Sequence, residues 1–320
     1  VITLILGAIV IGNTAYEGGN IGGATLGLQA LFGTEHSYLY PLIIGSLAFI
    51  FLYIGKYKTI EKILVALVIL MSISFILTAI VTKPNIIEIL KGLFIPTAPK
   101  NSLLSIIALV GTTIVPYNLF LHASLVSKKW NKTTDLKYAQ RDTILSISLG
   151  GLVSIAIMIT AAKTQSLEIK NVLDLAIGLE PIYGNSAKYF MGIGLFAAGL
   201  TSAITAPLAA AFVANSCFGW GSNMQNKRFK AVWMFIIILG VILMSYGIKP
   251  IEVIKLAQIA NGILLPIITI FLLWAVNRTS ILKTYKNTLI QNIIGIVIVV
   301  LTLGLGIMSV LKVFGIQVFA

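Results

Sequence analysis

The chain is a succession of long apolar runs separated by short polar stretches, and several runs reach the ~20 residues that a helix needs to cross ~30 Å of hydrocarbon. Apolar residues make up 58% of the 320 residues, charged residues only 10%, and the mean hydropathy is +1.00. A soluble domain carries roughly 25% charged residues. A protein core cannot absorb this much apolar surface, whereas lipid can. The sequence therefore predicts an all-α, polytopic membrane protein with a single transmembrane domain over residues 1–320.

About nine membrane-spanning segments are predicted from the ~20-residue apolar runs. The first is unusual, because a polar centre from Asn13 to Asn20 interrupts it. The nine expected segments are Val1–Phe32, Leu39–Ile54, Ile63–Val81, Leu103–Val126, Ile144–Ala162, Tyr189–Phe218, Val232–Tyr246, Ile254–Val276 and Leu289–Leu311.

Lysines and arginines are unevenly distributed between alternate loops. The loops after the second, fourth, sixth and eighth segments hold most of the 23 bases. By the positive-inside rule these loops face the cytoplasm, which places Val1 on the cytoplasmic side of a bacterial-type plasma membrane. The net charge of +13 does not indicate nucleic-acid binding, since the bases are scattered and form no basic face. Cys217 is the only cysteine, so an internal disulfide and a thiolate metal site are both excluded.

A proline in the middle of the fourth segment predicts an interrupted helix. Pro116 lacks an N–H group, and Gly111, Thr112 and Thr113 weaken the preceding turn. An unwound turn at the membrane midplane exposes carbonyl oxygens, which coordinate cations in transporters with broken helices. Tyr117 and Asn118 add polar side chains at the same depth. The alternative is a simple proline kink whose free carbonyls are satisfied by threonine hydroxyls.

The polar centre of the first segment contains an intramembrane carboxylate, Glu17. Such a group is costly unless it faces water or a partner, so Glu17 is either a pathway or gate residue or a structural hydrogen-bonding group. Glycines four residues apart indicate close helix contacts, and two such pairs follow here: Gly18 with Gly22, and Gly19 with Gly23.

Three further regions carry polar side chains within apolar segments. Gln258 offers a carbonyl oxygen to a hard cation, or else forms an interhelical hydrogen bond. The run from Gly194 to Asn215 is rich in small residues, which predicts close packing, with Thr201 and Ser202 as additional oxygens. His122 follows the broken helix and is either a structural histidine or a proton carrier.

The sequence lacks the residues and motifs that are characteristic of enzymes. All three aspartates lie in predicted loops, and the sequence contains no Walker loop, His-Glu-x-x-His or Gly-x-Ser-x-Gly motif. We therefore expect a protein that is not an enzyme and needs no cofactor.

The run Val115–Ser124 resembles the sixth helix of the NRAMP superfamily of divalent-metal transporters, which carries Met-Pro-His-Asn followed by Leu-Tyr-Leu-His-Ser. Ala198–Ser202 is similar to the family's eighth helix, and Gln258 to a glutamine of its tenth helix. The resemblance covers nearly the whole chain as helices 3–11 of a LeuT-like fold with two inverted repeats. It implies that the first two helices, including the metal-binding Asp-Pro-Gly-Asn, are missing and that the chain is an N-terminally truncated fragment.

Several positions depart from the family pattern. Val115 stands where the family has a metal-binding methionine, a ligand that favours softer metals, and Tyr117 stands where it has a histidine. Thr14 falls where proton-coupled members carry an aspartate, whereas Glu17 matches their glutamate. The segment from Val232 lacks the arginine pair of their proton route. These departures resemble the NRAMP-related magnesium transporters, a branch understood to work without proton coupling.

The combined prediction is a transporter of Mg²⁺, with Mn²⁺ as the second ion, that is not proton-coupled. Thr112, Tyr117, Asn118 and Gln258 are the predicted metal-site residues, and Glu17, Thr14, Val115 and His122 the predicted pathway or gate residues. The divalent ion and the lipid bilayer are the expected partners, and the oligomeric state is left open. A proton-coupled Mn²⁺/Fe²⁺ symporter and an amino-acid transporter on the same fold are the alternatives.

Overall fold

The computed structural model describes residues 2–55, 58–95, 116–130, 132–163, 176–220, 226–246 and 249–313, with a few isolated positions between residues 97 and 174. Within these ranges every regular element is helical, and short 3₁₀ turns cap or connect the α-helices. The α-helices are α1 (Ile2–Phe32), α2 (Tyr40–Ile54), α3 (Lys58–Val81), α4 (Ile86–Phe94), α6 (Pro116–Lys129), α7 (Leu136–Lys163), α9 (Glu180–Tyr183), α10 (Ala187–Phe218), α11 (Lys227–Ser245), α12 (Pro250–Val276), α13 (Thr279–Leu282) and α14 (Leu289–Val313).

Eight of the nine predicted segments coincide with one helix each: α1, α2, α3, α7, α10, α11, α12 and α14. Of the fourth segment, most residues before Pro116 lie outside the described residues, and α6 begins at this proline. Proline suits the first position of a helix, where its missing N–H group has no intrahelical acceptor in any case. The amphipathic helix α4 and the short α9 and α13 lie between the predicted segments.

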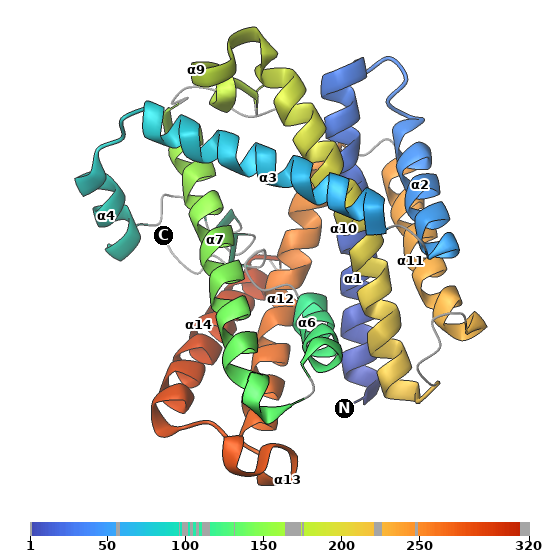
Figure 1. The fold of residues 1–320 in the computed structure, drawn as a ribbon, viewed down its shortest axis with the longest axis vertical. Coiled ribbons are helices and arrows are strands. Elements are labelled where there is room, and N and C mark those ends of the chain that lie inside the picture. The colour runs from blue at the N-terminus through green and yellow to red at the C-terminus, as the bar shows by residue number, and fades with distance from the viewer. Residues whose placement is uncertain are drawn as a thin grey trace.

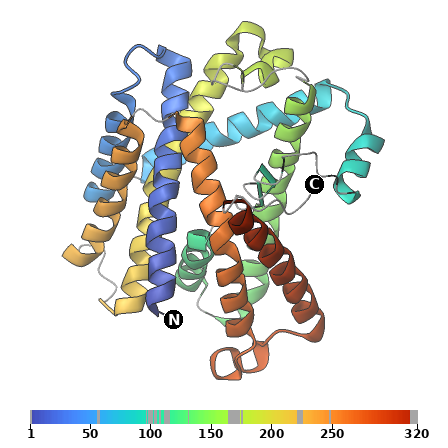
Figure 2. The same cartoon turned by 180° about the vertical axis from the view of Figure 1, so that it is seen from behind.

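Helices α1 and α10 form the centre of the bundle (Figures 1 and 2). They approach each other so closely that a Cβ atom on Gly27 would collide with the backbone of Phe196, and one on Gly199 with the backbone of Ala24. This confirms that the small residues of α10 serve close packing. The close helix contacts predicted for the glycine pairs of α1 are confirmed only in part. Gly18 and Gly22 contact α11 and α12, but a Cβ atom on Gly23 would meet nothing within 4 Å.

The peripheral helices present apolar surface outwards. Five described helical stretches are long and apolar enough to cross a membrane: Ile60–Val81, Leu136–Ala162, Ile177–Phe218, Lys227–Ser245 and Leu289–Met308. A sixth is counted if Leu264–Val276 and Thr279–Tyr285, which are bent by 61°, form one span. Exposed isoleucines and leucines dominate α7 and α14, as expected of helices that face lipid.

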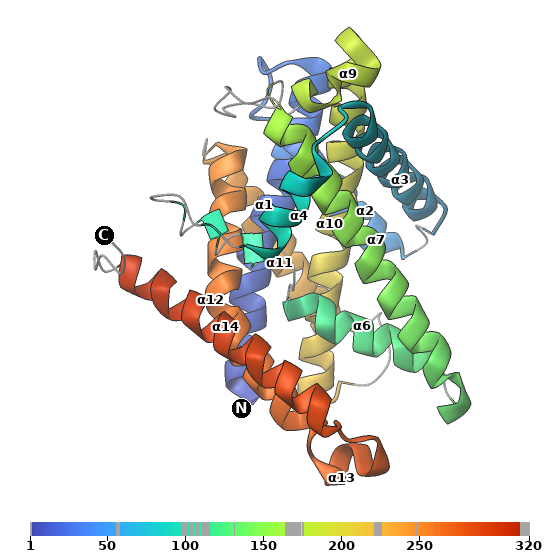
Figure 3. The same cartoon turned by 90° about the vertical axis from the view of Figure 1, so that its left-hand side faces the viewer.

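Three of the four base-rich connections are flanked by helix ends at one end of the bundle. The start of α1, the end of α6, the end of α10 and the turn around α13 lie at this end, whereas α9 lies at the opposite end and the base-rich end of α2 lies between the two (Figures 1 and 3). This arrangement agrees with a single membrane orientation for the bundle.

Candidate functional site

The polar centre of α1 is buried against three other helices. Glu17 is fully buried, and its side chain packs directly on Gly240 of α11, where a Cβ atom would lie only 2.5 Å from the Glu17 Cγ. A larger residue at position 240 would therefore displace the carboxyl group. Gly240 is a functional neighbour that sequence reasoning missed, because a lone glycine in an apolar helix does not reveal what it contacts.

The carboxyl group of Glu17 is only partly satisfied. Its Oε2 accepts a hydrogen bond of 3.3 Å from the Asn20 amide, one turn further along α1. Its Oε1 has no hydrogen-bond partner among the described residues. A buried polar atom without a partner costs ~1–3 kcal/mol, so the surroundings of Glu17 as well as its sequence position make it a candidate site residue.

Two other residues of the polar centre connect α1 to α10 and α6. Asn13, only 2% exposed, donates a hydrogen bond of 3.4 Å from Nδ2 to the Ala206 carbonyl of α10. Tyr16 packs against Ala206 and Ala209 of α10, and Leu121 of α6 packs against the same two alanines. Thr14 is half-buried in the same stretch. The polar centre of α1 therefore lies where α10, α11 and α6 converge.

Helix α6 brings the predicted metal-site residues toward this centre. It packs against α10 and contacts both α12 and α1. Tyr117 and Asn118 belong to its first turn, and Gln258 lies in α12. Thr112 and Val115 lie outside the described residues, as do the side chains of Tyr117, Asn118 and Gln258. The structure thus brings together the helices that carry these residues, without describing the ligand geometry.

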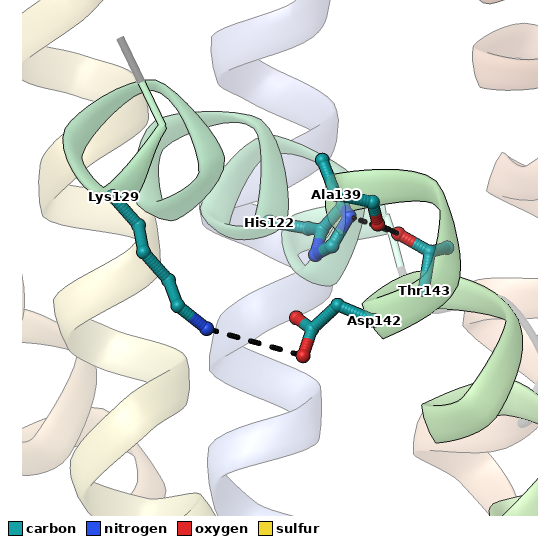
Figure 4. A network of polar contacts seen from close by, with 5 residues as sticks. All are labelled: His122, Lys129, Ala139, Asp142 and Thr143. Atoms are coloured by element: carbon teal, nitrogen blue, oxygen red, sulfur yellow. Dashed lines mark hydrogen bonds and ion pairs between the residues drawn. The ribbon is translucent and has the colours of Figure 1, made fainter. Parts of the chain in front are cut away.

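His122 is directed toward Thr143 of α7 (Figure 4). Its Nε2 lies 3.0 Å from the Thr143 Oγ1, which itself donates a 2.9 Å hydrogen bond to the Ala139 carbonyl. Because a hydroxyl has one proton to give, the imidazole is the donor to Thr143. Lys129 and Asp142 add an exposed ion pair of 3.9 Å between the same two helices. In this structure His122 joins α6 to α7.

Thr201, predicted as an additional oxygen on α10, is engaged within its own helix. The Thr201 hydroxyl donates to the Ala197 carbonyl at 2.7 Å. Among the residues that the structure describes, no three His, Cys, Asp or Glu side chains gather into a metal site.

Sequence comparison identifies a family. The model of the family Nramp (Natural resistance-associated macrophage protein-like) matches residues 1–312. The divalent metal cation transporter MntH of Caldanaerobacter subterraneus is 24% identical over 288 residues, covering 86% of this chain and 67% of the relative. The metal transporter nramp1 homolog of Dictyostelium discoideum is 28% identical over 207 residues, covering 60% of this chain but only 38% of the relative.

Structural comparison agrees with the sequence comparison. The manganese transporter of Eremococcus coleocola superposes with a TM-score of 0.71 at 18% identity, covering 97% of this chain and 70% of that one. This likeness confirms the predicted LeuT-like fold. Because the family model spans nearly the whole chain, the protein belongs to the Nramp family, and the relatives named above are metal transporters and not enzymes.

Proposed function

We propose that this protein carries Mg²⁺, with Mn²⁺ as its second ion, across a bacterial-type plasma membrane without coupling to protons. The observation that carries the proposal is the turn Val115-Pro116-Tyr117-Asn118, which retains the broken-helix proline but not the thioether or the imidazole of the family motif it resembles. The relatives named as manganese or divalent-metal transporters support divalent-cation transport in general.

Oxygen ligands favour a hard ion at this site. The Thr112 carbonyl and the amide oxygens of Asn118 and Gln258 coordinate the ion directly or through retained water, with Tyr117 lining the site. Mg²⁺ dehydrates reluctantly and usually keeps several waters, so a site without a soft ligand suits it.

The surroundings of Glu17 favour transport without a proton relay. Its side chain contacts the Asn20 amide and Gly240, neither of which titrates. Thr14, three residues earlier, does not titrate near neutral pH either. His122 is directed toward Thr143 of α7 instead. Glu17 acts as a gate residue whose carboxyl group has no described titrating side chain to pass a proton to.

The test is internal pH during metal uptake. The protein, expressed from its complete gene and reconstituted in liposomes, is expected to take up Mg²⁺ down its electrochemical gradient while a trapped pH dye stays constant. The same measurement is repeated with Mn²⁺, the proposed second ion. Acidification in fixed proportion to metal entry would contradict the proposal and favour a proton-coupled symporter.

A further inference from the structure

A lateral groove of about 500 Å³ lies between α12 and α14, away from the polar centre of α1. One part of the groove is apolar and its other end is polar. The lining residues are Ile270, Leu273, Val299, Trp274, Asn277 and Arg278. Trp274 is half-exposed, and α14 continues the apolar surface outwards with exposed Ile296 and Val300. The groove therefore opens onto the part of the bundle that faces lipid.

Asparagine hydrogen bonds fix the polar end of this groove. Asn277 donates from Nδ2 to the Leu273 carbonyl at 2.8 Å and to the Asn292 Oδ1 at 2.7 Å. Asn287 donates to the same Asn292 oxygen at 3.3 Å. These bonds join the end of α12 to the start of α14 and hold the intervening turn in place. The polar end is thus preformed and needs little ordering when a ligand binds.

The same end carries unopposed positive charge. Residues 277–288 contain Arg278, Lys283 and Lys286 but no acidic residue. None of these bases forms an ion pair with a carboxylate that the structure describes. The guanidinium of Arg278 lies over the Trp274 ring, 4.6 Å from its centroid, which holds it at the mouth of the groove. The exposed Ile281 and Tyr285 flank the lysines.

We propose that this groove binds one anionic phospholipid. An acyl chain lies along Ile270, Leu273 and Val299, and the phosphate meets Arg278, with Lys283 and Lys286 adding to the local potential. A guanidinium pairs with two phosphate oxygens at once, which makes Arg278 the principal contact. Tryptophan and tyrosine beside the bases are typical of the headgroup region. On the predicted cytoplasmic side, anionic lipid is the charge-complementary occupant.

The proposal concerns the lipid-facing surface, so it holds whichever ion is transported. The test is native mass spectrometry of the purified protein with equal amounts of palmitoyl-oleoyl phosphatidylglycerol and phosphatidylcholine. Arg278→Gln removes the phosphate contact. Arg228→Gln, an exposed arginine at the start of α11 on the same predicted side, makes the same chemical change outside the groove. Val299→Phe and Ile270→Phe fill the apolar part and leave the charge intact.

Wild type and Arg228→Gln are expected to retain phosphatidylglycerol in preference to phosphatidylcholine. Arg278→Gln should reduce that preference about fivefold, the effect of one base near an anionic lipid surface. The two groove-filling variants should lower occupancy by both lipids, with unchanged elution in size-exclusion chromatography showing that they fold. Equal preference in wild type and Arg278→Gln, or undiminished lipid in both filled variants, would overturn the proposal.

Discussion

At the scale of single residues, the proposed metal site depends on which ligand atoms the sequence beside Pro116 lacks. The valine side chain at position 115 offers no donor atom, whereas a thioether would favour transition metals. A proline within an apolar run predicts an interrupted helix, and α6 begins at this proline. The ligand geometry was not predictable, since it depends on how α6 and α12 are rotated about their axes.

Val115→Met should shift uptake toward Cd²⁺ and Mn²⁺ at the expense of Mg²⁺. The added sulfur is a polarisable ligand, and the longer side chain displaces waters that Mg²⁺ keeps. A tenfold change in relative affinity needs only ~1.4 kcal/mol, so one ligand is enough to be measured. Competition between Mg²⁺ and Cd²⁺ in liposomes, at one membrane potential, is the measurement. Val115→Leu provides the control for size, and identical competition in all three proteins would remove Val115 from the site.

Gly240→Ala should destabilise the protein by ~1–3 kcal/mol, the usual range for overpacking a filled interior. The new methyl group would lie 2.5 Å from Cγ and 3.0 Å from Cβ of Glu17, so the flexible end of that side chain cannot relieve the clash. The midpoint of thermal unfolding in detergent reports the effect. Gly304→Ala in α14 is the matched control, because its Cβ meets nothing within 4 Å and it should be neutral or stabilising. A Gly240→Ala protein as stable as this control would contradict the described packing.

At the scale of helices, hydropathy located the eight segments that the structure describes in full or nearly so, because the ~20-residue length needed to cross lipid leaves a strong signal. The contacts between helices were predicted less well. Both Gly23 and Gly27 lie in α1, yet only Gly27 meets the backbone of α10. Glycine spacing indicates a close contact, but the face that makes it is set by the neighbouring helices.

Gly199→Ala should destabilise the α1–α10 contact more than Gly240→Ala destabilises the α1–α11 contact. Its methyl group would meet the backbone of Ala24 and the carbonyl of Asn20, so the two helices must separate. Reduced expression and a lower unfolding midpoint are the expected results. Gly151→Ala in α7 is the control, because Gly151 is also helical and a Cβ atom at this position would have nothing within 4 Å. A smaller loss of stability for Gly199→Ala than for Gly240→Ala would contradict this ranking of the two helix contacts.

At the scale of the whole molecule, the distribution of bases predicts which end of the bundle faces the cytoplasm. Lys286 lies beyond α13 at the base-rich end, and Lys188 lies at the start of α10 near the opposite end. Both side chains are exposed, so both positions accept a cysteine without disturbing the core. Since Cys217 is the only cysteine among these 320 residues, Cys217→Ser removes their one native thiol.

In that background, a membrane-impermeant maleimide added to intact cells should label Lys188→Cys and not Lys286→Cys. Opening the cells with detergent should make both positions react, which shows that the unlabelled thiol is protected only by the membrane. The physical reason is that loops rich in lysine and arginine stay on the cytoplasmic side during insertion. Labelling of Lys286→Cys in intact cells would show that the orientation is the reverse of the predicted one. The proposed phospholipid groove would then lie in the outer leaflet, where its bases would no longer attract the anionic lipid of the cytoplasmic leaflet.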